Sequence, residues 1–357
     1  MLATIWPHAS YFLKDFSPYI VLLVSSFLIL VFGSYKIYKS NFSERKKKIF
    51  LSLIFTLFIF VLVFSCFEAY FRYRYDESDG LGFLKVSQKW HQRHVQINGD
   101  YFRDREFEAS KKEGVYRIGV IGDSLAEGDG IKNVQNRFSN LLEKKLNEAG
   151  YRTEVYNISR AGYDTEGEIV IYNKYKYLNF DLIVWEYFIN DIQPQEASTG
   201  TPIMVKNSRR AKIVDFISDK SFFLDYLYWR FSSVYDKTIN ALRNADIEQY
   251  KNQQRLAQHT QEITNFISSL KADNKKIVVI MFPSIQLLSQ SYPTFINDIM
   301  HKIFADNQVN VIDLYDSLKD KDPKSLRASK FDTHPNESVH KLASEKLFEE
   351  VKKQIQQ

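Results

Sequence analysis

Two uncharged apolar segments near the N-terminus most constrain how this chain can fold. They cover residues 19–35 and 49–67, and neither contains a charged side chain. Each is close to the ~20 apolar residues that a helix needs to cross a bilayer. A buried helical hairpin in a soluble core is the alternative, but two such segments so close together are unusual in a soluble fold. A cleaved signal peptide fits poorly, because no small-residue cleavage site follows the first segment.

The loop between the two segments predicts their orientation. Only Glu44 opposes its basic residues, which are Lys36, Lys39, Arg45, Lys46, Lys47 and Lys48. The positive-inside rule places such a loop in the cytoplasm. Arg72 and Arg74, after the second segment, oppose this assignment only weakly. We therefore expect a two-pass protein of the cytoplasmic (inner) membrane, with residues 1–70 as its anchor in the lipid bilayer. The C-terminal part would face the periplasm or the cell exterior.

Charge and cysteine content exclude several classes of function. Residues 1–70 hold seven Lys or Arg and three Asp or Glu, which accounts for most of the formal net charge of +5. The rest of the chain is nearly neutral and lacks the basic stripe of a nucleic-acid-binding domain. The single cysteine, Cys66, allows no intrachain disulfide and no Cys/His zinc framework. His91 and His94 lack a third ligand, which favours a surface position over a metal site.

Beyond residue 70 the chain divides by its periodicity. Residues 71–112 are polar and aromatic without a sustained period, and we interpret them as a juxtamembrane connector. From residue 113 onward, apolar strands alternate with amphipathic helices. Strands are predicted at 115–121, 154–158, 182–187, 276–282 and 309–314, and helices at 137–149, 165–177, 250–272 and 340–354. This alternation predicts an α/β fold, a three-layer sandwich with a mostly parallel sheet.

One segment, residues 193–244, interrupts the alternation. It begins with polar residues and then becomes rich in aromatic side chains at 222–229. Insertions over the active face of α/β enzymes often form lids or substrate walls. A packing helix that completes the sandwich explains the pattern equally well, so both interpretations stay open.

Polar residues follow the first three predicted strands. Ser124 follows the first, Gly162 the second and Asn190 the third. In open α/β sheets, ligands bind beyond the carboxyl ends of the strands. Asp332 and His334 lie two residues apart near the C-terminus. Serine, histidine and aspartate are the parts of a nucleophilic acyl-transfer site. Taken alone, however, a serine after a strand more often caps a helix.

These residues stand in the order of a known family, and the chain resembles the SGNH/GDSL hydrolases over roughly residues 113–357. The matching blocks are Gly122-Asp123-Ser124, Gly162, Asn190-Asp191, and Asp332 with His334 before Pro335-Asn336. An α/β-hydrolase would instead carry a Gly-x-Ser-x-Gly elbow, and Leu125-Ala126 follows the serine here.

The resemblance implies a role for each residue. Ser124 would be the nucleophile, His334 the general base, and Asp332 the group that orients the imidazole. The oxyanion hole would consist of the backbone N–H groups of Ser124 and Gly162 and the side chain of Asn190. The resemblance implies no cofactor, because this chemistry needs neither a metal nor a nucleotide.

Three features depart from the family's pattern. Phe188 stands where the common Gly-x-Asn-Asp block has glycine, which changes the pocket wall. Asp332 and His334 are one residue closer than in many members. Val339 replaces a glycine often found before a second histidine, so we interpret His340 as structural.

Together, the resemblance and the expected anchor point to the cell surface. The first hypothesis is a serine esterase that removes ester-linked acyl groups, chiefly O-acetyl groups, from a cell-surface glycan. An O-acyltransferase with the same acyl-enzyme is the second, with a sugar hydroxyl replacing water. A non-catalytic scaffold among membrane-bound proteins that modify surface polysaccharide is the third. The sequence specifies neither the acyl group, the acceptor nor the oligomeric state.

Overall fold

A computed structural model describes residues 9–194, 216, 218–288 and 292–356. The chain divides into two compact units. The helical unit comprises residues 1–76 and 210–231, and the sheet unit comprises residues 77–209 and 232–357. The family-like blocks all lie in the sheet unit. The predicted insertion at 193–244 is divided between the units, and its residues 195–215 and 217 lie outside the described part of the chain.

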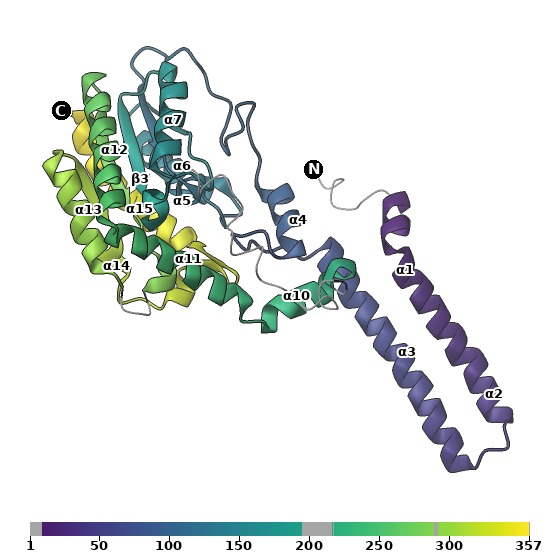
Figure 1. The fold of residues 1–357 in the computed structure, drawn as a ribbon. Helices are drawn as coiled ribbons and strands as arrows, with labels where there is room; N and C mark the ends of the chain where they lie inside the picture. The colour runs from purple at the N-terminus through teal and green to yellow at the C-terminus, as the bar shows by residue number, and fades with distance from the viewer. Residues whose placement is uncertain (1–8, 195–215, 217, 289–291, 357) are drawn as a thin grey trace. The chain divides into compact units, whose positions relative to one another are not determined.

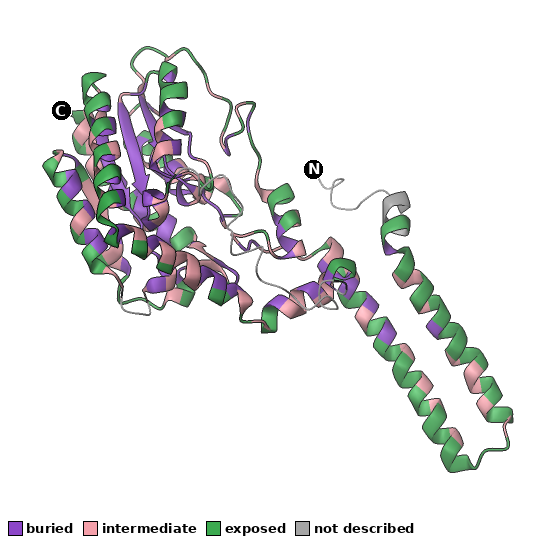
Figure 2. Ribbon diagram, viewed as in Figure 1, coloured by how far each residue is buried: buried purple, intermediate pink, exposed green. Residues whose placement is uncertain are grey.

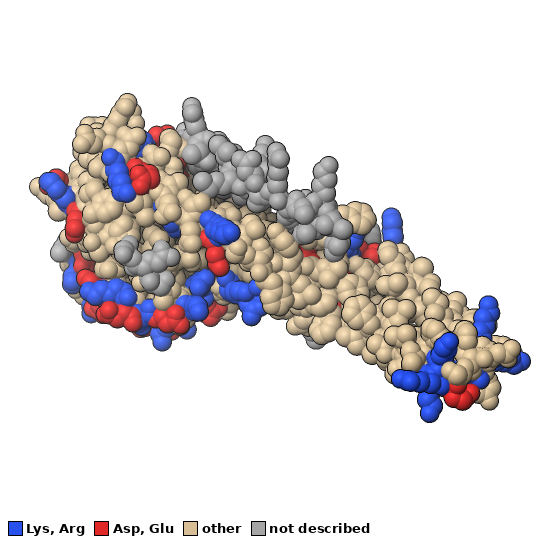
Figure 3. All heavy atoms as spheres, turned by 60° about the horizontal axis from the view of Figure 1, so that its bottom comes forward, with Lys and Arg blue, Asp and Glu red and all other residues tan. Residues whose placement is uncertain are grey.

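The helical unit contains two long apolar helical stretches. The first runs through α1 (Ala9–Leu28), a π-helical turn η1 (Ile29–Gly33) and α2 (Ser34–Lys39), and the second is α3 (Glu44–Tyr73). Lys14–Lys39 and Glu44–Tyr73 have mean hydropathies of 2.2 and 2.8, and both are long and apolar enough to cross a membrane. Most of their side chains are exposed (Figure 2). Figure 3 shows basic side chains gathered at the turn between α2 and α3, with the visible helix surfaces nearly free of them.

A short aromatic helix, α10 (Phe222–Phe231), completes the helical unit. Its N-terminus is held by Glu68 of α3, whose buried carboxylate accepts hydrogen bonds from Ser221 Oγ at 2.6 Å and from the N–H groups of Phe222 and Phe223 at 3.1 and 3.0 Å. Carboxylates at helix N-termini satisfy backbone donors that have no partner inside the helix. The aromatic stretch predicted at 222–229 is therefore helical and packs on α3.

The sheet unit is built on five parallel strands in the order β2-β1-β3-β4-β5. Their bounds are Tyr116–Ile121, Thr153–Asn157, Leu182–Tyr187, Lys276–Met281 and Asn310–Asp313 for β1 to β5. The central strands β1, β3 and β4 are buried almost throughout, which explains their near-continuous apolar sequences. The predicted α/β fold with a parallel sheet is confirmed.

Helices cover both faces of this sheet (Figure 1). On one face lie α6 (Phe138–Glu148) and α15 (Glu337–Gln356). On the other lie α7 (Thr165–Tyr175), α12 (Gln253–Ala272) and α13 (Thr294–Asp306), which meet around the buried ring of Trp185. The helix predicted at 250–272 begins later than expected, because Asn252 caps Gln254 and Arg255 and ends the preceding helix α11 (Val234–Lys251).

The remaining elements of the sheet unit are short, apart from α4 (Lys85–His94). An antiparallel pair near the C-terminus, β6 (Arg327–Ser329) and β7 (Asp332–Pro335), carries the Asp-x-His block. Short turns complete the unit: α5 (Ser124–Glu127), η2 (Val134–Asn136), η3 (Lys176–Leu178), η4 (Ile189–Ile192), η6 (Ile285–Leu287), α14 (Tyr315–Leu318) and η7 (Pro323–Ser325).

Residues 77–112 belong to the sheet unit, and this differs from the boundary expected at residue 113. Leu84, Trp90 and Phe102 are fully buried. The guanidinium of Arg103 is also buried and donates hydrogen bonds to the carbonyl oxygens of Gly128, Ile131 and His94. The segment has little regular structure, so its packing leaves no periodic pattern in the sequence.

Candidate active site

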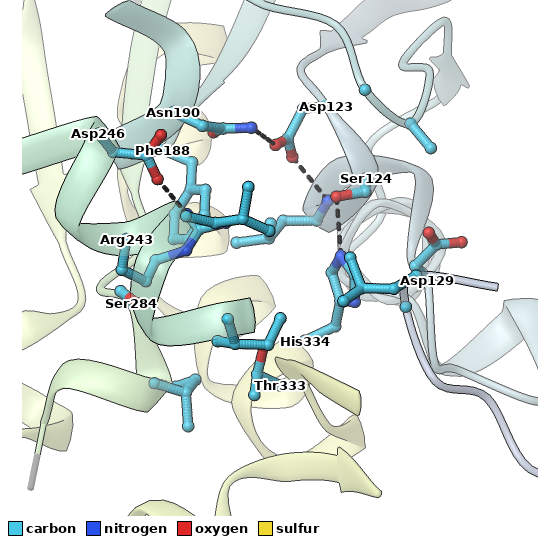
Figure 4. A pocket seen from close by; sticks show the side chains of 18 of the residues that line it. Asp123, Ser124, Asp129, Phe188, Asn190, Arg243, Asp246, Ser284, Thr333 and His334 are labelled. Carbon is cyan, nitrogen blue, oxygen red and sulfur yellow. Dashed lines mark hydrogen bonds and ion pairs between the residues drawn. The ribbon is translucent and has the colours of Figure 1, made fainter. Parts of the chain in front are cut away.

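Strand order brings the predicted polar groups to one edge. From β1 the chain first adds β2 at one side of the sheet, and it then returns to add β3 and β4 on the other side of β1. The strand order therefore reverses between β1 and β3. In such folds the crevice for ligands lies at the carboxyl ends of the strands at this reversal. Ser124 follows β1 and Asn190 follows β3. Both line one cavity of about 470 Å³, together with Gly162 and His334. Figure 4 shows Ser124, Asn190 and His334 around this cavity.

Ser124 opens the short helix α5 directly after β1. Asp123 caps this turn, because its carboxylate accepts the N–H of Leu125 at 2.7 Å. The same carboxylate accepts the side-chain amide of Asn190 at 3.0 Å. Gly122 is required by close packing, since a Cβ at this position would stand 2.6 Å from Glu186 Oε2. One buried aspartate therefore fixes both the serine turn and the asparagine.

The serine, histidine and aspartate form a continuous hydrogen-bonded chain. His334 Nε2 lies 2.8 Å from Ser124 Oγ, and His334 Nδ1 lies 2.6 Å from Asp332 Oδ1. Asp332 Oδ1 also accepts the backbone N–H of His334 at 3.0 Å. Asp332 is fully buried, whereas the His334 side chain is 16% exposed. These distances suit proton transfer from a serine hydroxyl to an imidazole whose other nitrogen is held by a carboxylate.

Electrostatics in the site favour a charged imidazole. Burial lowers the pKa of His334, but the carboxylate of Asp332, together with Asp129 and Asp123, outweighs burial and raises that pKa to about 9. Burial raises the pKa of Asp332, whereas the charge and hydrogen bonds of His334 and a hydrogen bond from Ser78 outweigh it, so the net pKa lies below its ordinary value. The pair thus stabilises the imidazolium that forms when serine loses its proton.

The loop that carries Gly162 is held by a second acid. The carboxylate of Glu127 accepts the N–H of Ala161, the residue before Gly162. Gly162 has a φ of +79°, and no heavy atom lies within 4 Å of where a Cβ would stand. Burial and the charge of Asp129 raise the pKa of Glu127 to about 7. The predicted oxyanion residues Ser124, Gly162 and Asn190 therefore share one cavity.

The cavity wall opposite the serine comes mainly from α11. Tyr235, Ile239 and Leu242 supply its apolar part, and Arg243 and Asp246 supply an ion pair of 2.9 Å. The guanidinium of Arg243 lies over the ring of Phe188, 4.9 Å from the ring centroid. Phe188, the residue that departs from the family's glycine, thus forms one surface of the cavity. The part of the predicted insertion that belongs to α11 therefore lines the cavity.

The other histidines considered in the sequence, His340, His91 and His94, lie elsewhere in the sheet unit. His340 is fully buried on α15, where its Nδ1 accepts the N–H of Phe138 at 3.2 Å and its ring stacks on the Phe138 ring. His91 and His94 both pack against the Trp90 ring on α4. Within the described residues, no group of three His, Cys, Asp or Glu side chains is arranged to hold a metal ion.

Sequence reasoning missed several residues of the site. Ser78 donates a hydrogen bond to Asp332 Oδ2 from a segment interpreted as a connector. Glu127 and Asp129, and the pair Arg243 and Asp246, also escaped notice. The signal for the first was available in Ser78-Asp-Gly-Leu-Gly82, a turn-like sequence with two glycines. Glu127, Asp129, Arg243 and Asp246 occupy helices and loops in which charged residues are common, so no sequence signal distinguishes them.

Comparisons with known proteins identify one matching family. The GDSL-like Lipase/Acylhydrolase family matches residues 120–342. Among solved structures, TesA aligns with a TM-score of 0.41 at 14% identity, over 65% of this chain and 96% of that chain. The esterase EstA from Pseudoalteromonas sp. aligns with a TM-score of 0.39 at 12% identity, over 68% of this chain and 99% of that chain. A lipase/acylhydrolase from Enterococcus faecalis aligns with a TM-score of 0.41 at 13% identity, over 67% and 96%. No curated protein sequence matches the chain.

Proposed function

Because this chain belongs to the GDSL-like lipase/acylhydrolase family and is an ester hydrolase, we propose that it removes acyl groups, chiefly O-acetyl, from a cell-surface glycan. The observation that carries the proposal is the chain of hydrogen bonds from Ser124 Oγ through His334 to Asp332, at 2.8 and 2.6 Å, inside an open cavity. The reaction proceeds through an acyl-enzyme on Ser124.

In the first half-reaction, Ser124 Oγ attacks the ester carbonyl carbon while His334 Nε2 takes the hydroxyl proton. The resulting oxyanion accepts hydrogen bonds from the backbone N–H groups of Ser124 and Gly162 and from the Asn190 amide. The amide nitrogen of Asn190 carries two hydrogens, and one of them is donated to Asp123, so the other is left for the oxyanion. Collapse of the intermediate breaks the ester C–O bond, and the imidazolium protonates the departing alcohol.

The second half-reaction restores the enzyme. His334 removes a proton from a water molecule, which attacks the acyl-enzyme carbonyl, and the same three donors stabilise the second oxyanion. Breaking the bond to Ser124 Oγ releases the carboxylic acid, and the imidazolium returns its proton to the serine. Asp332 keeps its charge throughout and holds the imidazole in the tautomer that presents an unprotonated Nε2 to Ser124.

Two features support a glycan at the cell surface. The long apolar stretches Lys14–Lys39 and Glu44–Tyr73 are joined by a basic turn, which favours a two-pass anchor with the sheet unit outside the cytoplasm. The cavity also places Gln193, Arg243 and Asp246 beside its apolar wall. Polar side chains of this kind can bind sugar hydroxyls, whereas a purely apolar wall would suit a fatty acyl chain.

The test uses the full-length protein in detergent. Hydrolysis of p-nitrophenyl acetate and covalent labelling by a fluorophosphonate probe are measured for the wild type, Ser124→Ala and His334→Ala. We expect both variants to lose labelling and turnover while keeping the wild-type melting temperature. Ser344→Ala and His301→Ala are matched controls, because Ser344 on α15 and His301, which pairs with Asp313, both lie outside the cavity.

Acylated polysaccharides and the corresponding free glycans then serve as substrates. Release of acetate identifies the esterase, and transfer of a labelled acetyl group to the free glycan identifies an acyltransferase. Labelling that persists in Ser124→Ala would refute the assignment of the nucleophile. A folded wild type that is neither labelled nor active would instead favour a scaffold among membrane-bound polysaccharide-modifying proteins.

A further inference from the structure

A short segment before α4 lies against the Asp332–His334 pair, and its residues Gly80 and Leu81 also line the cavity. This segment, residues 78–84, is called the strap here. Ser78 is buried, and its hydroxyl donates a hydrogen bond to Asp332 Oδ2. Ser329 of β6 in turn donates its hydroxyl to the carbonyl oxygen of Ser78 at 3.0 Å. The strap therefore reaches the acid across more than 250 residues of sequence and is tied to the hairpin that carries it.

Asp79 gives the strap a fixed shape. Its buried carboxylate accepts the N–H groups of Leu81, Gly82 and Leu84 at 3.0, 2.6 and 2.5 Å, which closes a tight turn. Side-chain hydrogen bonds of aspartate to the backbone that follows it stabilise such turns. Tyr235 of α11 donates its hydroxyl to the carbonyl oxygen of Asp79 at 3.0 Å. The strap is thus pinned on both sides, by β6 and by a helix that lines the cavity.

Gly80 brings the strap backbone into contact with the pair itself. Its φ is +64°, and a Cβ at this position would stand 2.9 Å from both Asp332 Oδ1 and His334 Nδ1. These two atoms form the 2.6 Å hydrogen bond of the pair. Only glycine allows so close an approach without displacing one of them. The contact leaves no room for a water molecule on the Gly80 side of this hydrogen bond, and exclusion of water strengthens the bond.

We propose that the strap is a fourth part of the catalytic machinery, in which Ser78 positions Asp332 and Gly80 shields the hydrogen bond between Asp332 and His334. This inference rests on the proposed function, since it assigns Asp332 and His334 their roles in acyl transfer. Asp332 Oδ1 accepts two N–H groups of His334, and Oδ2 accepts the hydroxyl of Ser78. With both oxygens bound, the carboxylate cannot rotate away from the imidazole.

The strap also lies outside the part of the chain that the family matches, which begins at residue 120. It precedes that region by about forty residues and follows the end of α3 by five. Within the described residues, the support for the acid therefore comes from a segment next in sequence to the second apolar helix.

The test compares two glycine variants of the full-length protein in detergent. Gly80→Ala and Gly82→Ala both place an alanine at a positive φ, +64° and +73°, so both carry backbone strain of this kind. They differ in surroundings, since a Cβ at Gly82 meets nothing within 4 Å. We expect the rate of fluorophosphonate labelling of Ser124 and kcat to fall at least tenfold further in Gly80→Ala than in Gly82→Ala. Equal rates in the two variants would overturn the shielding role.

Ser78→Ala and Ser78→Thr test the positioning role. We expect Ser78→Ala to lower kcat about tenfold with KM nearly unchanged, because a hydrogen bond to a charged group is lost without change in the substrate cavity. Ser78→Thr retains the hydroxyl and should restore most of kcat. A Ser78→Ala enzyme with wild-type kcat would overturn this role.

The controls separate this inference from the proposed function. Failure of the wild type to be labelled, or labelling that persists in Ser124→Ala, counts against the proposed function itself. A wild type labelled at Ser124 together with strap variants that react at the wild-type rate counts against the strap alone. Thermal unfolding of each variant shows whether a loss of rate comes from loss of the fold.

Discussion

Replacing Asp332 by asparagine separates two contributions of the acid, its charge and its control of the imidazole tautomer. Oδ1 accepts both the N–H and the Nδ1–H of His334, so an asparagine should turn its carbonyl oxygen toward the histidine. Its amide group then faces Ser78, whose hydroxyl can rotate and accept. The tautomer is preserved in this arrangement, and only the charge is lost.

The size of the effect follows from the pKa of His334. Asp332 is the largest influence that raises this pKa from its ordinary 6.5 to about 9, against the opposing effect of burial. One pKa unit corresponds to ~1.4 kcal/mol, so the imidazolium is favoured by about 3 kcal/mol. Without the charge, we expect the limiting kcat at high pH to fall roughly 10²-fold. A substitution that inverts the tautomer costs ~10⁴-fold instead.

The direction in which activity changes with pH follows from the role of His334 as a base. The base must be neutral, so activity appears as pH rises through the pKa of His334. In the wild type this acid limb should lie near pH 9, and in Asp332→Asn it should move to lower pH, because only Asp129 and Asp123 then oppose the effect of burial on the pKa of His334. The ratio of wild-type to variant rates should therefore grow with pH.

The assay is the rate of fluorophosphonate labelling of Ser124 from pH 6 to 10, with kcat for p-nitrophenyl acetate corrected for spontaneous hydrolysis. Asp313→Asn is the matched control, since Asp313 accepts from His301 Nε2 at 2.9 Å in a pair outside the cavity. A loss of 10⁴-fold or more would refute the preserved tautomer, because it would mean that the asparagine turns its amide toward His334. An acid limb that stays at the wild-type pH would refute the contribution assigned to the charge of Asp332.

Three further predictions concern stability and topology. Burial and the neighbouring Asp123 raise the pKa of Glu186 well above its ordinary value, so the folded state keeps a proton that the unfolded chain releases above pH ~4.5, and stability falls as pH rises beyond this. The melting temperature of Glu186→Gln should therefore fall less than that of the wild type between pH 5 and 8. The same dependence of melting temperature on pH in both proteins would contradict this. His340→Ala should lower the free energy of unfolding by about 2–4 kcal/mol, because it leaves a cavity beside the Phe138 ring and removes the acceptor of the Phe138 N–H. The kcat of this variant should stay within about twofold of the wild type. Denaturant unfolding measures the first effect and steady-state kinetics the second. A reporter fused after Gln357 should read outside the cytoplasm, and a cytoplasmic signal would remove the cell-surface substrate.

The sequence predicted the sheet well because buried parallel strands leave a strong local signal. Each of the five predicted strands overlaps an observed one, as 182–187 does with Leu182–Tyr187. The convergence of Ser124, Gly162 and Asn190 followed from the rule that ligands bind at the carboxyl ends of strands. Asp332 and His334 stood out in the sequence as a carboxylate and an imidazole two residues apart. Only the resemblance to a family gave each a role beside Ser124, since nothing local in the sequence places them near it.

The strap could not be predicted for a related physical reason. Its hydrogen bond joins Ser78 to Asp332, and a pairing at such separation has no periodicity in the sequence. Residues 77–112 pack through buried aromatic rings and the Arg103 guanidinium, in a segment with a single helix of ten residues. A polar segment without a period resembles a linker by composition, and only its long-range contacts distinguish it from one.

The acids behind the serine illustrate the same limit. Glu168, Glu186 and Asp191 are all buried, and burial together with the charge of Asp123 raises the pKa of each well above its ordinary value. In sequence, an acidic residue within a strand or helix signals solvent exposure. Burying such groups is costly, and it is tolerable here because they bind the backbone and side chains that shape the site, as Glu186 does for the N–H of Asp123 at 3.2 Å.

The position of the strap determines which fragments of the chain retain the whole candidate site. A fragment that starts where the family match begins, at residue 120, keeps Ser124, Asp332 and His334 but lacks Ser78 and Gly80. In such a fragment Asp332 Oδ2 loses its hydroxyl donor, and the Asp332–His334 hydrogen bond is open to water. This fragment also begins inside β1 and lacks the buried side chains of Leu84, Trp90 and Phe102, so a low rate in it would not distinguish loss of the strap from loss of the fold. A fragment that starts at residue 77 retains the strap, the whole of β1 and the residues of the candidate site.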